Sequence, residues 1–287
     1  MKIAHFIGAA LLAALCTAGA AQARDQIDDN DAVVIDPAKA YVFFRTAQRQ
    51  DVHFLRVITP EVRAEHETAR AAAYAEAVAA YERRLARWER NIGECRASGI
   101  TCREAPIRPS EEEFPFPSIE STNLVTVKRG PQFTRAEGAY TYLMAVTPGI
   151  YALHASTRTT QFGPSGVCLC MGSVAFEARA GQIVDLGEIV YPRLAAGDDG
   201  IPGLPGRVPS HSIRAPDQST PPPARLAGFP VVPAEWRAAD RVPNILRIEI
   251  DRMRPIDGIL AYDRDRVIDL KARAAPTAPA PTANGGN

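Results

Sequence analysis

Residues 139–158, "AYTYLMAVTPGIYALHASTR", predict two β-strands joined by a tight turn. Alternate positions of the first run carry large side chains that would share one face of a strand: Tyr140, Tyr142, Met144 and Val146. Pro148 and Gly149 suit the two central positions of a type II turn over residues 147–150, because the second of them requires a positive φ. We therefore expect a pair of neighbouring antiparallel strands around this turn.

Similar short runs, rich in β-branched and aromatic residues, occur on both sides of this stretch. They cover residues 32–35, 40–46, 52–58, 123–129, 167–179, 182–190, 244–250 and 258–270. Successive strands with tight turns are typical of two packed sheets. The sequence thus predicts a mainly β protein with a long helical insertion. Its expected fold is an antiparallel β-sandwich, Ig-like or prealbumin-like, that carries a helix-plus-return projection.

The remaining composition divides the chain further. We expect the first strands of the sandwich in 24–58, the insertion in 59–117 and the main sandwich in 118–193. A proline-rich irregular segment in 194–243, C-terminal strands or a hairpin in 244–271 and a disordered Ala/Pro tail in 272–287 complete the chain.

The insertion begins with a helix start signal, Thr59-Pro60-Glu61, which offers an N-cap, a proline at the first helical position and an acid in the first turn. Large side chains then recur at helical spacing: Tyr74, Val78, Tyr81, Leu85, Trp88 and Ile92. We expect a helix over 60–92 that ends at Gly93. Its stripe lies either against the β domain or the returning segment 101–117, or in a coiled coil that makes a homodimer through the 60–92 helix.

The first 23 residues have the form of a cleaved secretory signal. Lys2 precedes an apolar stretch over 3–16, and Ala21-Gln22-Ala23 is a small-residue cleavage site. No later run is long and apolar enough for a transmembrane segment. We therefore expect a periplasmic or secreted protein cleaved after Ala23. The 33 basic and 33 acidic residues balance, which does not favour nucleic acid as a partner.

Four cysteines remain in the mature chain: Cys95, Cys102, Cys168 and Cys170. In an oxidising compartment, the proximity of Cys95 and Cys102 around a Ser-Gly turn predicts a disulfide that pins the helix end. On a regular strand, Cys168 and Cys170 would share one face with β-carbons about 6.5–7 Å apart, too far for a bridge.

Three outcomes stay open for Cys168 and Cys170. A bulge, which Gly172 favours, would let them bridge; each could pair with Cys95 or Cys102; or they remain thiols and bind a soft metal together with Met171. The first outcome makes all four cysteines structural. The last indicates thiol-redox or copper(I) chemistry.

Three segments carry a resemblance: "DPAKAYVFFR" (36–45), "VTPGIYAL" (146–153) and "GSVAFEARAGQIVDLG" (172–187). Together they resemble uncharacterised exported bacterial proteins of the domain-of-unknown-function kind, which have a small β-sandwich. The resemblance covers about half of the mature chain. It implies a carrier or envelope-associated module and no catalytic residues.

Other candidate sites lack the patterns that their chemistry needs. Residues 163–167, "GPSGV", lack the closing glycine of a nucleophile elbow. Metal-ligand spacing is absent among His53, His66, His154 and His211, and we interpret His154 as an ordinary strand residue. We therefore predict a non-enzymatic envelope protein with an unknown envelope protein partner and no cofactor or metal. The alternative is a thiol-redox or copper(I)-handling protein that uses Cys168 and Cys170.

Overall fold

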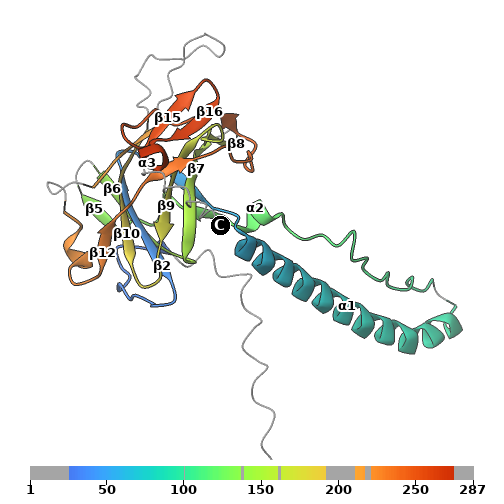
Figure 1. The fold of residues 1–287 in the computed structure, drawn as a ribbon. Helices are drawn as coiled ribbons and strands as arrows, with labels where there is room; N and C mark the ends of the chain where they lie inside the picture. The colour runs from blue at the N-terminus through green and yellow to red at the C-terminus, as the bar shows by residue number, and fades with distance from the viewer. Residues whose placement is uncertain are drawn as a thin grey trace, which may run out of the picture. The chain divides into compact units, whose positions relative to one another are not determined.

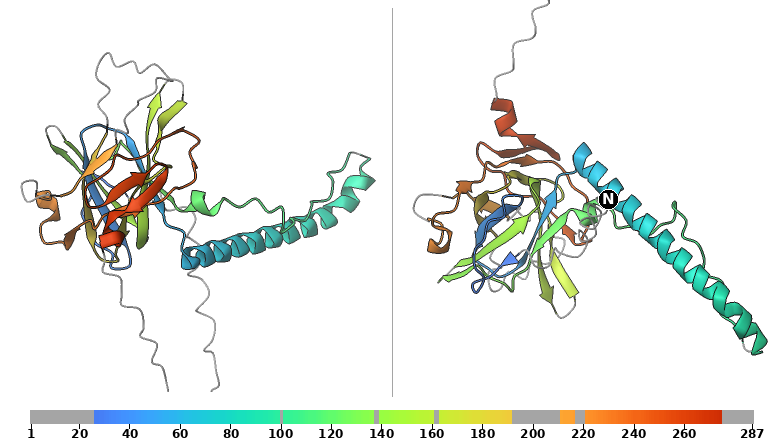
Figure 2. Two further views of the ribbon diagram at one scale, coloured as in Figure 1. Left: turned by 45° about the horizontal axis from the view of Figure 1, so that its top comes forward. Right: turned by 90° about the horizontal axis from the view of Figure 1, so that it is seen from below.

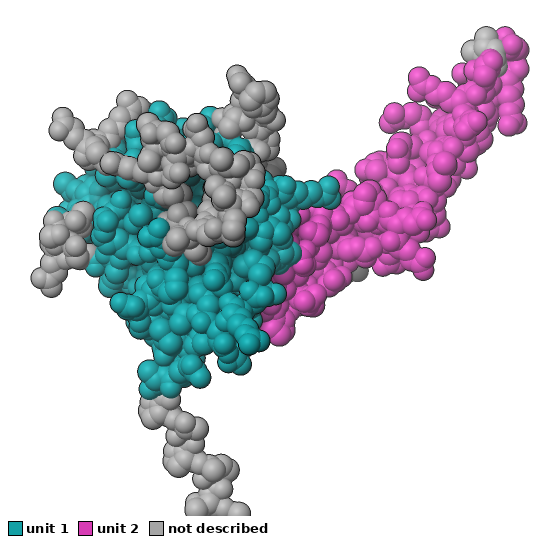
Figure 3. Space-filling model, turned by 90° about the horizontal axis from the view of Figure 1, so that it is seen from above, with its two compact units in different colours: residues 1–56, 125–287 teal, residues 57–124 magenta. Residues whose placement is uncertain are grey.

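The computed structural model describes residues 26–99, 101–136, 139–160, 163–191, 211–216 and 221–274. It is mainly β, with one long helix (Figure 1). The chain divides into two compact units, residues 1–56 with 125–287 and residues 57–124, coloured separately in Figure 3. We call them the β unit and the helical unit. The expected signal peptide and most of the expected tail lie outside the described residues.

The first sheet of the β unit has its strands in the order β1, β6, β2, β10, β11, with β5 beside β6 and β12 beside β10. Their bounds are β1 Gln26–Ile27, β2 Ala40–Thr46, β5 Thr134–Ala136, β6 Ala139–Val146, β10 Ile183–Val190, β11 Ser212–Arg214 and β12 Val231–Pro233. β10 runs parallel to β2 and β12, whereas the other pairs are antiparallel. The sheet is therefore mixed, and the expectation of a purely antiparallel sandwich is wrong.

The second sheet has the order β13, β9, β7, β3, β4, with β8 beside β7 and β14 beside β8. Their bounds are β3 Asp51–Arg56, β4 Leu124–Val127, β7 Gly149–Thr160, β8 Gly163–Cys168, β9 Ser173–Ala178, β13 Arg237–Ala239 and β14 Glu249–Ile250. A separate hairpin, β15 (Leu260–Asp263) and β16 (Arg266–Asp269), leads into α3 (Leu270–Ala274). The C-terminal hairpin is thus where the sequence predicts it.

Side chains from both sheets share one core. Phe44 of β2 stacks on Tyr142 of β6 at 5.2 Å between ring centroids, and it meets Phe54 of β3 edge-on at 5.7 Å. Phe176 of β9 extends the aromatic cluster to Trp236, whose ring lies 5.3 Å away and is 2% exposed. Such contacts between the two layers position β7, which carries the candidate site.

The outer face of the first sheet is buried as well. Tyr41 and Phe43 of β2 face a second cluster, against which Val33 and Ile35 pack. Burial on both faces explains why β2 is apolar from Ala40 to Phe44; Arg45, which follows, is buried in an ion pair with Asp185. The run 32–35 covers the sheet in this way without forming a strand, so the prediction of a strand there is wrong.

β6 and β7 do not pair, although the chain joins them through only two residues. β6 belongs to the first sheet and β7 to the second, and Gly149 has a φ of 156°, far from the value near 80° of a type II turn. The predicted type II turn between paired strands is therefore wrong. Pro148 and Gly149 instead carry the chain from one layer to the other.

The proline-rich segment is more ordered than the sequence predicts. Its described parts include β11, the 3-10 turn Ala224–Leu226, β12 and β13, and they extend both sheets. Pro233 ends β12, which pairs only with β10, so the missing N–H of proline is tolerated there. The expectation of an irregular segment over 194–243 is wrong for these parts.

The helical unit contains α1 (Pro60–Ala97) and the short α2 (Ile119–Thr122). Thr59 caps α1 as predicted, because its hydroxyl accepts a hydrogen bond from the Val62 N–H at 3.3 Å. The helix continues past Gly93, however, and ends at Ala97, followed by Gly99 with a φ of 67°. One interior glycine costs a helix only about 1 kcal/mol, which this long helix tolerates.

The returning segment of the same chain runs beside α1 in Figure 2, and side chains of the α1 stripe contact it. Tyr74 meets Phe114 at 5.5 Å between ring centroids, and the Trp88 indole donates a hydrogen bond to the Arg103 carbonyl at 2.8 Å. This is the first of the two predicted arrangements. Pairing with a second copy stays a prediction. In the described part of the chain, no helix combines the length and apolar character needed to span a membrane.

Candidate functional site

A β-bulge in β7 places His154 out of register with its neighbour β3. His53 pairs with Ala155 and Phe54 with Leu153, so His154 is an extra residue with no partner across the ladder. Bulges interrupt pairing and re-aim the side chain of the extra residue. His154 is fully buried as a result of this local geometry.

The other edge of β7 carries a matching interruption. Ala155 pairs with Cys168 and Ala152 pairs with Ala175. Between these two pairs, the β8–β9 side has four more residues than β7. These are residues 169–172, which form a turn between β8 and β9. The Leu169 N–H still donates to the His154 carbonyl at 2.8 Å. The predicted single strand over 167–179 is therefore two strands with a turn between them.

This turn is what lets two cysteines in a C-x-C sequence meet. Cys168 ends β8 and Cys170 lies in the turn; the two form a disulfide with their Cα atoms 5.1 Å apart. Gly172 follows with a φ of 135°, and a Cβ there would lie 2.7 Å from a ring carbon of Tyr262 and 2.7 Å from a methyl of Val267. The sequence prediction that Gly172 assists an irregular backbone at this point agrees with this geometry.

The segment 242–253 holds the turn through backbone hydrogen bonds. They run from Met171 N–H to Asp251 carbonyl (3.1 Å), Asp251 N–H to Cys168 carbonyl (2.8 Å), Met253 N–H to Gly172 carbonyl (2.9 Å) and Val242 N–H to Cys170 carbonyl (3.1 Å). β14, within this segment, also runs parallel to β8. The position of the cysteines is thus fixed by the main chain as well as by the disulfide.

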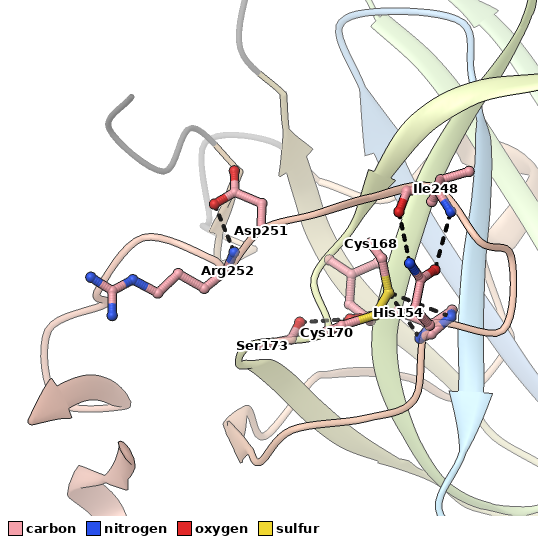
Figure 4. Close-up of a disulfide and its surroundings, with 9 residues drawn as sticks. His154, Cys168, Cys170, Ser173, Ile248, Asp251 and Arg252 are labelled. Carbon is pink, nitrogen blue, oxygen red and sulfur yellow. Dashed lines mark hydrogen bonds between the residues drawn. A yellow bond between two sulfur atoms is a disulfide. The ribbon is translucent and has the colours of Figure 1, made fainter. Parts of the chain in front are cut away.

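His154, Cys168 and Cys170 gather in one buried cluster (Figure 4). Their potential ligand atoms all lie within 4.8 Å of one another, and their residues are 0%, 0% and 5% exposed. Among the residues that the structure describes, this is the only group of three or more histidine, cysteine or acidic side chains with such a geometry.

The sulfur of Cys168 lies almost equally far from the two ring nitrogens of His154. It is 3.9 Å from Nδ1 and 3.8 Å from Nε2, and such nearly equal distances do not fit a hydrogen bond directed along one nitrogen. Burial lowers the pKa of His154 to about 4, so the imidazole is neutral near pH 7. The cluster therefore combines a neutral imidazole with two sulfur atoms away from solvent.

The sequence interpretation of His154 as an ordinary strand residue missed this cluster. His154 and Cys168 are 14 residues apart, a spacing that resembles no common metal motif. Only the antiparallel pairing of β7 with β8 could have indicated that His154 lies beside Cys168. The other predicted bridge, Cys95–Cys102, lies in the helical unit with its Cα atoms 5.8 Å apart.

Two other buried histidines have ordinary hydrogen-bond partners. His53 lies between the hydroxyls of Thr126 and Thr157, each 2.9 Å from a ring nitrogen, and burial lowers its pKa to about 4. His211 Nε2 lies 3.0 Å from the Ser156 hydroxyl, with both residues buried. These contacts satisfy both ring nitrogens of His53 and the Nε2 of His211.

Comparison of the chain with protein-family models, with curated proteins and with solved structures gives no match. The assignment of a function therefore depends on the geometry of the chain itself.

Proposed function

We propose that the protein is a non-enzymatic module of the cell envelope that binds a protein partner through its helical unit. An Ig-like or prealbumin-like sandwich would serve as the scaffold. The observation that carries this proposal is an open groove within the helical unit, between α1 and the returning segment. Ala77 and Ala80 line it from the helix, and Ile107 and Phe114 line it from the return.

The side chains of the groove indicate the chemistry of its partner. Ile107 is 88% exposed, which is unusual for an isoleucine and costs solvation free energy in water. Arg84 and Arg108 lie beside the apolar side chains, and Glu113 is the one acidic residue among the described residues of the lining, so the charged side chains of the groove are net basic. An extended segment with an apolar side chain followed by an acidic one would cover Ile107 and pair with the arginines.

Site-specific photocross-linking in the full-length protein tests this proposal. A photoreactive residue at position 107 should give one dominant cross-linked partner in envelope preparations. The same residue at Ile250, which is 54% exposed in the β unit, should not give that partner. Ile107→Glu, tested with the photoreactive residue at Ala80 on the helix side of the groove, should abolish capture, because a carboxylate at position 107 removes the apolar contact and repels an acidic partner. Equal capture from both positions would reject the groove as the binding site.

The proposed location has an independent test. If the chain is exported and cleaved, the mature protein begins at Arg24, and intact mass spectrometry of the protein from its native envelope should show loss of residues 1–23. An intact Met1 on protein recovered from the cytoplasm would contradict export.

A second candidate function, thiol-redox or copper(I) handling, is favoured by the position of His154 against the cysteine pair. Disulfide exchange with another protein requires a thiolate to reach one sulfur in line. Cys168 is fully buried and Cys170 is 5% exposed, which hinders such an attack by a folded partner. Metal binding by the reduced pair requires only a small ion to enter, so burial favours that form of the candidate.

A further inference from the structure

We propose that His154, Cys168 and Cys170 form a three-coordinate site for one Cu(I) ion once the Cys168–Cys170 disulfide is reduced. This inference deepens the copper-handling candidate and rests on it, and it is independent of partner capture through the helical unit. It adds a histidine ligand from another strand to the two cysteines of the C-x-C sequence.

The donor set suits a soft metal ion. Two thiolates and a neutral imidazole are preferred ligands of Cu(I), and hard cations such as Ca²⁺ or Mg²⁺ require oxygen donors. Structural zinc sites take four protein ligands and three-ligand zinc sites keep an open position for water, whereas the described residues supply three ligands here, all buried. The donor atoms already lie within 4.8 Å of one another, so a single ion can contact all three once the two sulfur atoms separate and a ring nitrogen of His154 turns toward it.

The main chain holds these residues in place without the disulfide. The bulge fixes His154, and the hydrogen bonds of segment 242–253 fix the turn that carries Cys170. Breaking the sulfur–sulfur bond therefore removes one constraint among several. Among the described residues, the ring nitrogens of His154 have no polar contact other than Cys168 Sγ, so a turn of the ring toward a metal breaks no other described hydrogen bond.

The chemistry balances with a dithiol reductant. The dithiol gives two electrons and two protons to the Cys168–Cys170 disulfide, becomes a disulfide itself and leaves two thiols on the protein. Cu(I) then binds as both thiols lose their protons, while His154 contributes a nitrogen lone pair and remains neutral. Neither copper nor the protein changes oxidation state in the binding step. The oxidised pair offers no thiolate and does not form the site.

Copper stoichiometry tests the proposal on a C95S/C102S variant of the expected mature chain, residues 24–287, in which Cys168 and Cys170 are the only cysteines. Reduced with a small dithiol and titrated with the Cu(I)–bicinchoninate complex, it should bind one Cu(I) per chain. The same protein left oxidised should bind none. Failure of the reduced protein to bind, equal binding by the oxidised protein, or resistance of the folded protein to reduction would each overturn the proposal.

X-ray absorption of the copper-loaded variant identifies the ligands without any change at the site. We expect two sulfur neighbours and one nitrogen neighbour, and a sulfur-only shell would remove His154 from the site. His154→Gln should lower the Cu(I) affinity at least about tenfold, since loss of even an outer-shell partner costs a metal site 10–100-fold. His53→Gln, a second buried histidine, is the matched control and should retain the affinity. Cross-linking from position 107 is expected to be unchanged by His154→Gln and His53→Gln in a chain that keeps the Cys95–Cys102 bridge, so the two proposals fail separately.

Discussion

At the scale of single residues, Gly172 shows how one backbone position controls the candidate site. Its positive φ and its contacts with Tyr262 and Val267 leave no room for a side chain. The Tyr262 hydroxyl also lies 3.2 Å from the Gly172 carbonyl and 2.9 Å from the Met253 carbonyl. The turn, the hairpin and segment 242–253 therefore meet at this glycine.

We predict that Gly172→Ala lowers the free energy of unfolding by about 1–3 kcal/mol, because it adds backbone strain and a steric clash. Gly130→Ala is the control, since a Cβ there has no atom within 4 Å and its φ is not positive. Urea denaturation of both variants measures the difference. Equal stability of the two variants would show that the turn can shift without loss.

His53 predicts a loss of stability in acid. Burial lowers its pKa to about 4; Asp51 opposes this shift, and Lys128 and His154 support it. An unfolded histidine has a pKa of about 6.5, so between pH 6.5 and 4 the unfolded chain binds more protons than the folded chain. The contribution of His53 to the free energy of unfolding is fully present above pH 6.5. It is lost as the pH falls toward 4, by about 3 kcal/mol in all.

Urea denaturation at several pH values between 7.5 and 4.5 measures this loss. His53→Gln should flatten the dependence by roughly half, because buried His154, whose pKa is also about 4, contributes a loss of the same sign. A variant with the same dependence as the unsubstituted protein would contradict this prediction.

The residue scale also shows what the sequence can and cannot predict about the site. The Cys95–Cys102 pair follows from spacing and the expected compartment, the Cys168–Cys170 bridge is one of three outcomes that the sequence leaves open, and Gly172 is evidence for an irregular backbone. The place of His154 in the cluster cannot be predicted from spacing, because the bulge that sets its side chain beside Cys168 depends on the pairing of β3 with β7. No local pattern in "YALHAST" encodes that bulge.

At the scale of elements, the Cys95–Cys102 bridge joins the last turn of α1 to the returning segment. A bridge between these residues closes a short loop and is worth about 2.5 kcal/mol by the chain-entropy relation. We predict that a C95S/C102S variant frays at the helix end, so that amides of residues 93–99 exchange hydrogen faster. The amides of β2 and β7 should keep their protection. Unchanged exchange in 93–99 would show that the contact of Trp88 with the return is sufficient.

Elements whose signals are local could be predicted from the sequence. The bounds of β2 and β6 agree with their runs, and Thr59 starts α1 as its cap chemistry indicates. The partners of these elements could not be predicted, because a Pro-Gly turn suits a connection between layers as well as a hairpin. The prediction that α1 ends at Gly93 is wrong, because the contacts of the last turns outweigh the free-energy cost of a glycine inside the helix.

At the scale of the whole molecule, the helical unit is inserted between β3 and β4, which are neighbours in one sheet. His66 Nε2 lies 3.0 Å from the Pro117 carbonyl, so the beginning of α1 and the end of the return lie close together. Only Val62 is buried along α1. The β unit therefore has its own core, and the two ends of the insertion lie close enough to be joined by a short loop.

We predict that replacing residues 60–122 by a short Gly/Ser loop leaves the β unit folded. The thermal midpoint should change by less than about 4 °C, the shift that 1 kcal/mol produces in a domain of this size. Calorimetry and near-ultraviolet circular dichroism check the outcome. Loss of the cooperative transition would show that the β unit needs the insertion in order to fold.

The distribution of prolines shows where composition misleads at this scale. Residues 211–216 and 221–243 supply short strands to both sheets, because single prolines are tolerated at sheet edges and strand ends. A proline-rich composition alone cannot distinguish such edge strands from a tether. The pairing of β11 and β12 with β10, and of β13 with β9, identifies these segments as edge strands.

The two tryptophans of the chain are divided between the two units, with Trp88 on α1 and Trp236 inside the aromatic core. Each unit thus contains its own intrinsic fluorophore. In Trp88→Phe the emission spectrum would report only the β unit, and in Trp236→Phe only the helical unit. Each unit can therefore be followed optically during denaturation or partner binding without an added dye.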